Sequence, residues 1–170
     1  MAIIEGVTAE ILNYAGVPGT GTDEVQTLTI DATGGTFKLK FEGFVTAAIS
    51  WSATNTTLRD NVDTALEALP SIGTGGITTA VGTMTAGVGT LTLTFAGNRG
   101  KQAIGSLVTV ANNSLTGTAT LSIAETTPGV DATFRGAPKG QLVVDTTNGK
   151  LYINTGTALA PTWTVAGTQS

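Results

Sequence analysis

Hydrophobic and polar residues alternate in two nearly identical nonapeptides. Residues 35–43 read GTFKLKFEG and residues 89–97 read GTLTLTFAG. Successive side chains of a β-strand point to opposite faces, so each copy is predicted to bury one apolar triplet. These triplets are Phe37, Leu39 and Phe41, and Leu91, Leu93 and Phe95. The opposite face carries Lys38 and Lys40 in the first copy and threonines in the second. The alternation is typical of antiparallel strands with one solvated face.

Other apolar runs predict further strands. They lie near residues 25–30, 45–51, 77–81, 107–111, 119–124 and 161–165. A hairpin is predicted within residues 140–154, because Asn148-Gly149 suits the positive-φ positions of a type I′ turn.

One stretch, residues 57–69, has helical periodicity. Its apolar residues fall at i, i+4, i+7, i+8 and i+11 and form one stripe: Leu58, Val62, Ala65, Leu66 and Leu69. Thr57 and Asp60 form a weak capping box at the start, and Pro70 is expected to end the helix. The fold class predicted is mainly β: an antiparallel sandwich or barrel-like domain with one helix.

Composition shifts divide the chain into four parts. Residues 1–24 are an N-terminal arm and tether, 25–125 a central β-rich domain, 126–139 a linker, and 140–170 a C-terminal β-hairpin module. The arm carries short apolar groups before a Gly/Pro/Thr stretch. It either folds back on its own domain or docks on a neighbouring subunit, and the sequence leaves both open.

Amino-acid composition excludes several kinds of catalytic and metal-binding site. The chain has 170 residues and 34 threonines, but only 20 charged side chains, with no cysteine and no histidine. Disulfides, thiolate nucleophiles, Cys/His zinc sites and histidine-based catalysis are therefore excluded. The net charge is −4 with scattered cations, so nucleic-acid binding is not expected. A signal peptide and a membrane span are not expected either, and the protein is expected to be soluble.

Candidate functional groups all have simpler structural interpretations. Asp23-Glu24 and the pair Asp60 and Asp63 are the nearest carboxylates for acid–base work, but they fit turn and helix-surface positions better. Trp51 and Trp163 could stack on sugars, although core packing is the favoured interpretation. No enzymatic activity, cofactor or metal is expected.

Two segments resemble virion proteins of tailed bacteriophages. Residues 23–125 resemble a strand–helix–strand module of such proteins, and residues 140–167 resemble a closing motif of head-decoration and fibre-like proteins. The first resemblance is carried by EVQTLTI at 24–30, GGTFKL at 34–39, NVDTALEAL at 61–69 and GTLTLTF at 89–95. The second is carried by VDTTNGKLYI at 144–153 and PTW at 161–163.

The resemblance is strongest to capsid decoration, or cement, proteins. It implies a homotrimer, made in the host bacterial cytoplasm, that binds the major capsid protein on the outer capsid surface between capsomers and stabilises the head. The residues suggested for capsid or subunit contacts are Ile3, Ile4, Val7, Ile11, Leu12, Tyr14, Tyr152 and Trp163. The second hypothesis is a tail fibre or adhesin component that binds host glycans through Trp51, Trp163 or Tyr152.

Overall fold

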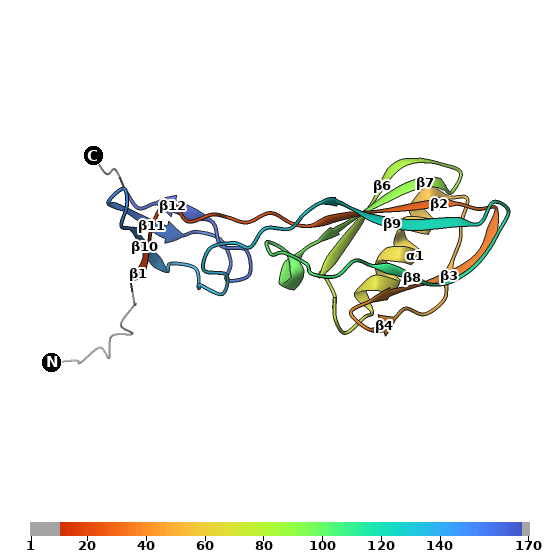
Figure 1. Cartoon of the computed structure of the whole chain (residues 1–170), viewed down its shortest axis with the longest axis horizontal. Helices are drawn as coiled ribbons and strands as arrows, with labels where there is room; N and C mark the ends of the chain where they lie inside the picture. Colours follow the sequence, from red (N-terminus) through yellow and green to blue (C-terminus); the bar gives the residue numbers. More distant parts are fainter. Residues whose placement is uncertain (1–10, 168–170) are drawn as a thin grey trace. The chain divides into compact units, whose positions relative to one another are not determined.

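The computed structural model describes residues 11–167 and divides them into two compact units. The larger unit runs from Thr22 to Val130, and the smaller one combines residues 11–21 with residues 131–167. Part of the predicted N-terminal arm therefore lies in the same unit as the predicted C-terminal module. Figure 1 shows the elements of each unit.

The first sheet of the larger unit is fully antiparallel, with strand order β6-β7-β2-β9. Its strands are β2 (Val25–Asp31), β6 (Ile77–Thr85), β7 (Val88–Phe95) and β9 (Thr120–Thr127). The inward face of β2 carries Leu28 and Ile30, which are fully buried. This sheet forms one wall of the core.

The second sheet is built around β3. Its strands are β3 (Gly34–Phe41), β4 (Phe44–Val45), β5 (Ile49–Ser50) and β8 (Thr109–Thr116). Thr36 pairs with both Ser50 and Ser114, so β5 and β8 lie on opposite edges of β3. Lys40 likewise pairs with Val45 and Thr109, which puts β4 on the same edge as β5. The two short strands are thus successive pieces of one interrupted edge strand.

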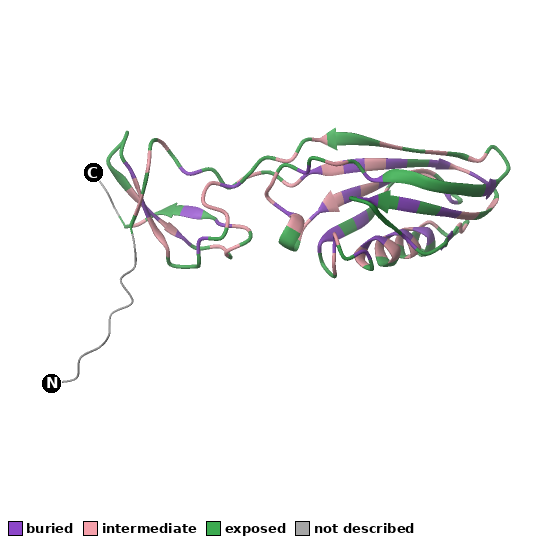
Figure 2. Cartoon of the chain, turned by 60° about the horizontal axis from the view of Figure 1, so that its bottom comes forward, coloured by how far each residue is buried: buried purple, intermediate pink, exposed green. Residues whose placement is uncertain are grey.

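The helix closes one side of this two-sheet sandwich. Helix α1 (Asn55–Glu67) contacts β6, an edge of the first sheet, and β5, an edge of the second. Its buried residues Leu58, Val62 and Leu66 join the core shared by both sheets. Figure 2 shows buried residues alternating with exposed ones along the strands, as expected for strands with one buried face. The prediction of a mainly β fold with one helix is confirmed.

The two repeated nonapeptides form β3 and β7, one in each sheet. All six apolar residues of the two predicted triplets are fully buried. At the ends of the strands, the rings of Phe41 and Phe95 meet across the core with centroids 5.2 Å apart. The burial of both triplets is as the alternation predicted, and the structure adds that the two strands face each other across the core.

The helix begins at Asn55, two residues before its predicted start. The N-cap is Thr54, whose side chain makes no capping hydrogen bond, so Thr57 and Asp60 do not form a capping box. The Asn55 side chain instead donates to the Met84 carbonyl at 2.9 Å and accepts from the Gly87 N–H at 2.8 Å. These tertiary bonds position the first turn in place of a local cap. The apolar stripe itself is confirmed.

Two strand predictions also need correction. The strand expected over residues 45–51 is broken, because Thr46 bonds to both backbone groups of Leu39 and the chain then bulges before β5. The strand expected over residues 119–124 is longer, because β9 (Thr120–Thr127) extends to Thr127 through pairing with Val25. Neither tertiary contact is visible in local sequence.

The smaller unit is a four-stranded sheet of order β1-β10-β11-β12. Its strands are β1 (Leu12–Tyr14), β10 (Leu142–Asp145), β11 (Lys150–Asn154) and β12 (Trp163–Val165). The first strand pairs in parallel with β10, with Leu12 opposite Val143, and the other pairs are antiparallel. Ala137, Val143, Tyr152 and Trp163 form its core.

The β10–β11 hairpin is confirmed, but its turn is not type I′. Asp145 pairs with Lys150, so four residues form the loop, and Gly149 has positive φ while Asn148 does not. The Asp145 carboxylate determines this turn: it accepts from the backbone N–H groups of Thr147 (2.9 Å) and Asn148 (3.0 Å). Such a side-chain bond offers the backbone a local turn that competes with the shorter hairpin.

Asp145 is also the polar centre of the unit, buried and surrounded by donors. The Asn148 side-chain amide donates to it at 2.7 Å and the Gly16 N–H at 3.1 Å. The Asn148 side-chain bond is the main cause that lowers the pKa of Asp145 from its ordinary value of 3.8, against the opposing effect of burial. The carboxylate thus links β10 to the residues that follow β1.

The facing phenylalanines give a first prediction. Phe95→Ala is expected to lower the free energy of unfolding by about 3–5 kcal/mol, because it removes a buried ring and leaves a cavity. Phe44→Ala is the matched control, since Phe44 is 46% exposed, and about 0.5 kcal/mol or less is expected. Urea unfolding followed by Trp51 fluorescence in a Trp163→Phe background measures both. Equal losses would contradict the described core.

Acid should destabilise the smaller unit through Asp145. Because its pKa is lowered by folding, its contribution is present above the ordinary value of 3.8 and is lost as pH falls through the folded value. Asp145→Asn should weaken this unit at neutral pH and flatten its acid dependence. Trp163 fluorescence in a Trp51→Phe background, measured from neutral pH downwards, tests this. An unchanged acid dependence in Asp145→Asn would assign the effect to another group.

Candidate interaction surface

The residues suggested for intersubunit contacts have different locations. Ile3, Ile4 and Val7 lie outside the described residues. Ile11 is 50% exposed. The other four lie together inside the smaller unit: Tyr152 and Trp163 in its core, with Leu12 and Tyr14 packed against them. Because these four side chains pack against one another, little of their surface is left to contact a second molecule.

Trp163 is fixed by a hydrogen bond of its indole and by aromatic packing. Its indole N–H donates to the Thr133 carbonyl at 3.0 Å, and its ring meets Phe134 edge-on with centroids 6.2 Å apart. Phe134 in turn meets Tyr14 edge-on at 5.6 Å. These contacts join β1, β12 and the segment before β10, so Trp163 is a packing residue.

Trp51 is held in the larger unit beneath the β6–β7 turn. Its indole N–H donates to the Gly87 carbonyl at 3.1 Å. Gly87 has φ +77°, and a Cβ there would lie 2.7 Å from the indole, so the turn approaches the ring as closely as glycine allows. All three aromatic side chains considered for sugar stacking are therefore engaged in contacts within the chain.

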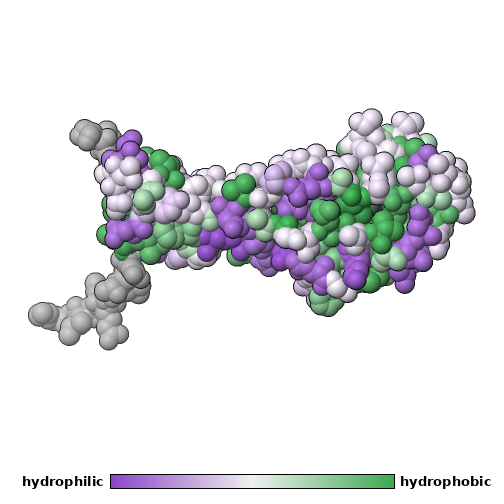
Figure 3. All heavy atoms as spheres, viewed as in Figure 1, coloured by the Kyte–Doolittle hydropathy of each residue, from purple (hydrophilic) through white to green (hydrophobic). Residues whose placement is uncertain are grey.

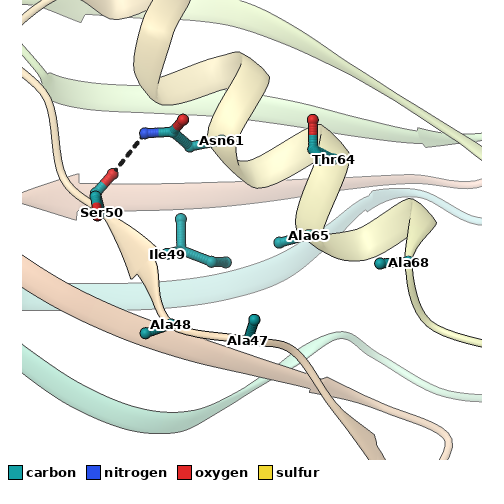
Figure 4. A pocket seen from close by; sticks show the side chains of 8 residues that line it. All are labelled: Ala47, Ala48, Ile49, Ser50, Asn61, Thr64, Ala65 and Ala68. Carbon is teal, nitrogen blue, oxygen red and sulfur yellow. Dashed lines mark hydrogen bonds between the residues drawn. The ribbon is translucent and has the colours of Figure 1, made fainter.

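A hollow of about 330 Å³ lies between the interrupted edge strand and α1 (Figure 4). Its lining is small: Ala47, Ala48, Ile49 and Ser50 on the strand side, and Asn61, Thr64, Ala65 and Ala68 on the helix side. Asn61 donates to the Ser50 carbonyl at 2.9 Å across it. None of the side chains that line the hollow is titratable, so the hollow could accommodate an apolar group but supplies no acid or base.

The outer face of the second sheet carries two exposed lysines, Lys38 and Lys40, on successive outward positions of β3. The other cations of the larger unit are each paired with a carboxylate: Arg59 with Asp60, Arg99 with Glu42 and Lys101 with Asp23. Within residues 11–167, neither Lys38 nor Lys40 has an ion pair. This lysine face is a local positive region on an acidic protein.

The side of the sandwich away from α1 is open. β8 pairs with β3 and β9 pairs with β2, but no hydrogen-bonded ladder joins β8 to β9 within the described part of the chain. We call these two facing edges the open seam. Apolar side chains gather over β8 and β9 in Figure 3. They include Val110, which is 37% exposed, and the half-buried Leu121 and Ile123.

Two buried polar side chains, Glu24 directly before β2 and Gln26 on it, hold the loop that leads into β8. The Glu24 carboxylate accepts from the Ile104 N–H at 3.0 Å and from the Gln26 amide at 2.7 Å. The Gln26 carbonyl oxygen accepts from the Val108 N–H at 2.8 Å. Both side chains are at most 1% exposed, so these bonds fix the approach of the loop to the strand.

Sequence reasoning missed this pair. The sequence favours turn charge for Asp23-Glu24, whereas Glu24 is buried directly before β2 and continues the alternation of its inward face. The period-2 alternation of Glu24, Gln26, Leu28 and Ile30 is the signal that could have shown it. Glu24 thus has a structural partner for each carboxylate oxygen.

The residues that the structure describes include no acidic cluster suited to a metal ion and no long apolar helix. They contain no cluster of three or more acidic, histidine or cysteine side chains that could hold a metal ion. No helix among them is long and apolar enough to cross a membrane.

Comparisons with known proteins add one structural likeness. No protein-family model matches this sequence, and no curated protein matches it either. Among solved structures, the chain is similar to one from Mycobacterium phage Patience, at 13% identity and a TM-score of 0.43. The likeness covers 92% of this chain and 60% of that chain. The protein thus spans less than two thirds of the length of the chain it matches.

The buried amide of Gln26 is expected to matter for stability. Gln26→Leu would leave the Val108 N–H and one Glu24 oxygen without their partner, at a cost of about 1–3 kcal/mol. Gln102→Leu is the control, because Gln102 is half-buried and donates to a carbonyl within its own loop at 3.3 Å. About 0.5 kcal/mol is expected there.

Urea unfolding measures the loss of unfolding free energy in each variant, and amide hydrogen exchange shows where in the chain the loss occurs. The Ile104 and Val108 amides should exchange faster in Gln26→Leu than in Gln102→Leu. If exchange at these two amides did not change, the loop would be held by other contacts.

Proposed function

We propose that this chain is a decoration protein of a tailed-bacteriophage head. It binds the outer capsid surface where capsomers meet, contacts the major capsid protein, and acts as a homotrimer without catalysing a reaction. The observation that carries the proposal is the resemblance of residues 23–125 and 140–167 to segments of phage virion proteins. The structure adds a description of which surfaces such a protein could use.

The proposed role is mechanical. Capsid subunits under internal DNA pressure separate at their boundaries, and a molecule bound across a boundary resists this. Contacts of one copy need not be strong, because three linked copies raise the apparent affinity by about 10²–10⁴. The exposed apolar side chains Phe44 and Val45 beside the lysine face, and the hollow beside α1, are surfaces available for such contacts.

The second hypothesis, a tail adhesin that stacks glycans on aromatic side chains, has less support. Tyr152 is 6% exposed and Trp163 is 8% exposed, and the indole of Trp51 is covered by Gly87. Location in the virion separates the two hypotheses. Labelled protein should coat heads under the first and tail tips under the second.

Removal of residues 1–10 is expected to lower occupancy of the capsid. A longer deletion would remove β1 and with it part of the core of the smaller unit, so the cut is placed before Ile11. Loss of avidity should weaken binding by about 10²-fold or more. The measurement is occupancy on undecorated heads by cryo-EM across a protein titration.

Removal of residues 168–170 is the matched control, because it also trims an end outside the described residues. If the variant without residues 168–170 occupies the heads and the variant without residues 1–10 does not, the result supports the role of the arm. Equal occupancy would remove that role. Protein found only on tails would overturn the proposal itself.

A further inference from the structure

The open seam has the features of a binding edge for an additional strand. β8 and β9 each present an eight-residue edge, and their only charged side chain is Glu125. Native proteins generally cover, shorten or charge such edges, because unpaired backbone groups recruit other strands. This edge pair is long and nearly uncharged.

The core is also incompletely covered at the seam. Leu121 and Ile123 of β9 pair with Ile30 and Leu28 of β2 and share their inward face. The β2 side chains are fully buried, but those of β9 are only half-buried. On the opposite side of the sandwich α1 covers the corresponding edges, so within the described residues the seam is the side without a covering element.

The first ten residues of the chain, MAIIEGVTAE, lie outside the described structure and match this edge in length and charge. A strand of eight of them would span β8 from end to end. Their only charged side chains are Glu5 and Glu10. The lysine face lies on β3, next to β8, whereas β9 carries Glu125, so charge favours pairing along β8.

We propose that residues 1–10 of one copy add as a strand to the free edge of β8 in a second copy. Alternation then places Glu5, with Ile3 and Val7, on the face of Lys38 and Lys40, and Ile4 on the opposite face, toward the half-buried Leu121 and Ile123. Each copy donates one strand and accepts one, which closes a ring when the rotation permits. The ring size of three rests on the proposed function, but the pairing does not.

Disulfide trapping tests the pairing, because the natural chain has no cysteine. Ala9→Cys protein is mixed with protein carrying Thr109→Cys or Ser114→Cys, which lie near the two ends of β8 on its outward face. The strand direction decides which end Ala9 reaches, so one of the two mixtures should yield a disulfide-linked dimer. Thr147→Cys, exposed in the smaller unit, is the control partner and should yield little.

The outcomes are distinct on non-reducing gels. A dimer with one β8 position and not with Thr147→Cys supports the proposal. No dimer with either β8 position, or equal dimer with all three, overturns it. A single chain carrying Ala9→Cys and the reactive β8 cysteine that crosslinks at monomer mass would show that the segment folds back on its own chain, which also overturns it.

Charge reversal gives a second readout. Lys38→Glu with Lys40→Glu should weaken self-association about 2–5-fold per lysine, measured by sedimentation. Lys139→Glu with Lys150→Glu makes the same charge change at exposed sites of the smaller unit and should have little effect. Equal effects would overturn the contact with the lysine face. Capsid occupancy is scored separately, so failure of head binding with intact crosslinking would count against the proposed function alone.

Discussion

The larger unit depends on the burial of one face of two alternating strands. Six apolar side chains are fully buried between the two sheets: Phe37, Leu39 and Phe41 of β3, and the matching residues of β7. Each side chain of this size contributes about 1.5–3 kcal/mol by leaving water. Helix α1 covers the core on one side. On the other side, at the open seam, no helix or strand of the described residues covers it. The hollow beside α1 and the open seam on the other side both follow from this asymmetric enclosure.

Buried polar side chains fix loops in both units. In the larger unit Gln26 on β2 and Glu24 directly before it stand in place of apolar residues and bind loop amides. In the smaller unit Asp145 and Asn154 have that role, and Asn154 donates to the Ala137 carbonyl and accepts from the Gly156 and Thr162 N–H groups. A chain with few large side chains can fix its loops in this way, because a buried amide satisfied on all sides determines one backbone path.

Local patterning predicted the elements well where a single period governs the residues. The alternation of Phe37 to Phe41 and the stripe from Leu58 to Leu69 are set by burial on one face, and burial is visible in sequence. The turn at Asn148-Gly149 and the cap at Thr57 were wrong because a distant or neighbouring side chain supplied the hydrogen bonds instead. Apolarity alone does not separate a core residue such as Trp163 from a docking residue, so the sequence could not distinguish the two roles for the suggested contact residues.

The pairing of β1 with β10 has a consequence for biogenesis. Leu12 pairs with Val143, so about 130 residues must be synthesised before the first strand meets its partner. The larger unit is continuous from Thr22 to Val130 and can fold as soon as it leaves the ribosome. The smaller unit can be completed only afterwards, and a chain truncated before β10 would retain a folded larger unit while exposing Leu12 and Tyr14. Quality control in the cell would therefore have an apolar signal that marks unfinished chains.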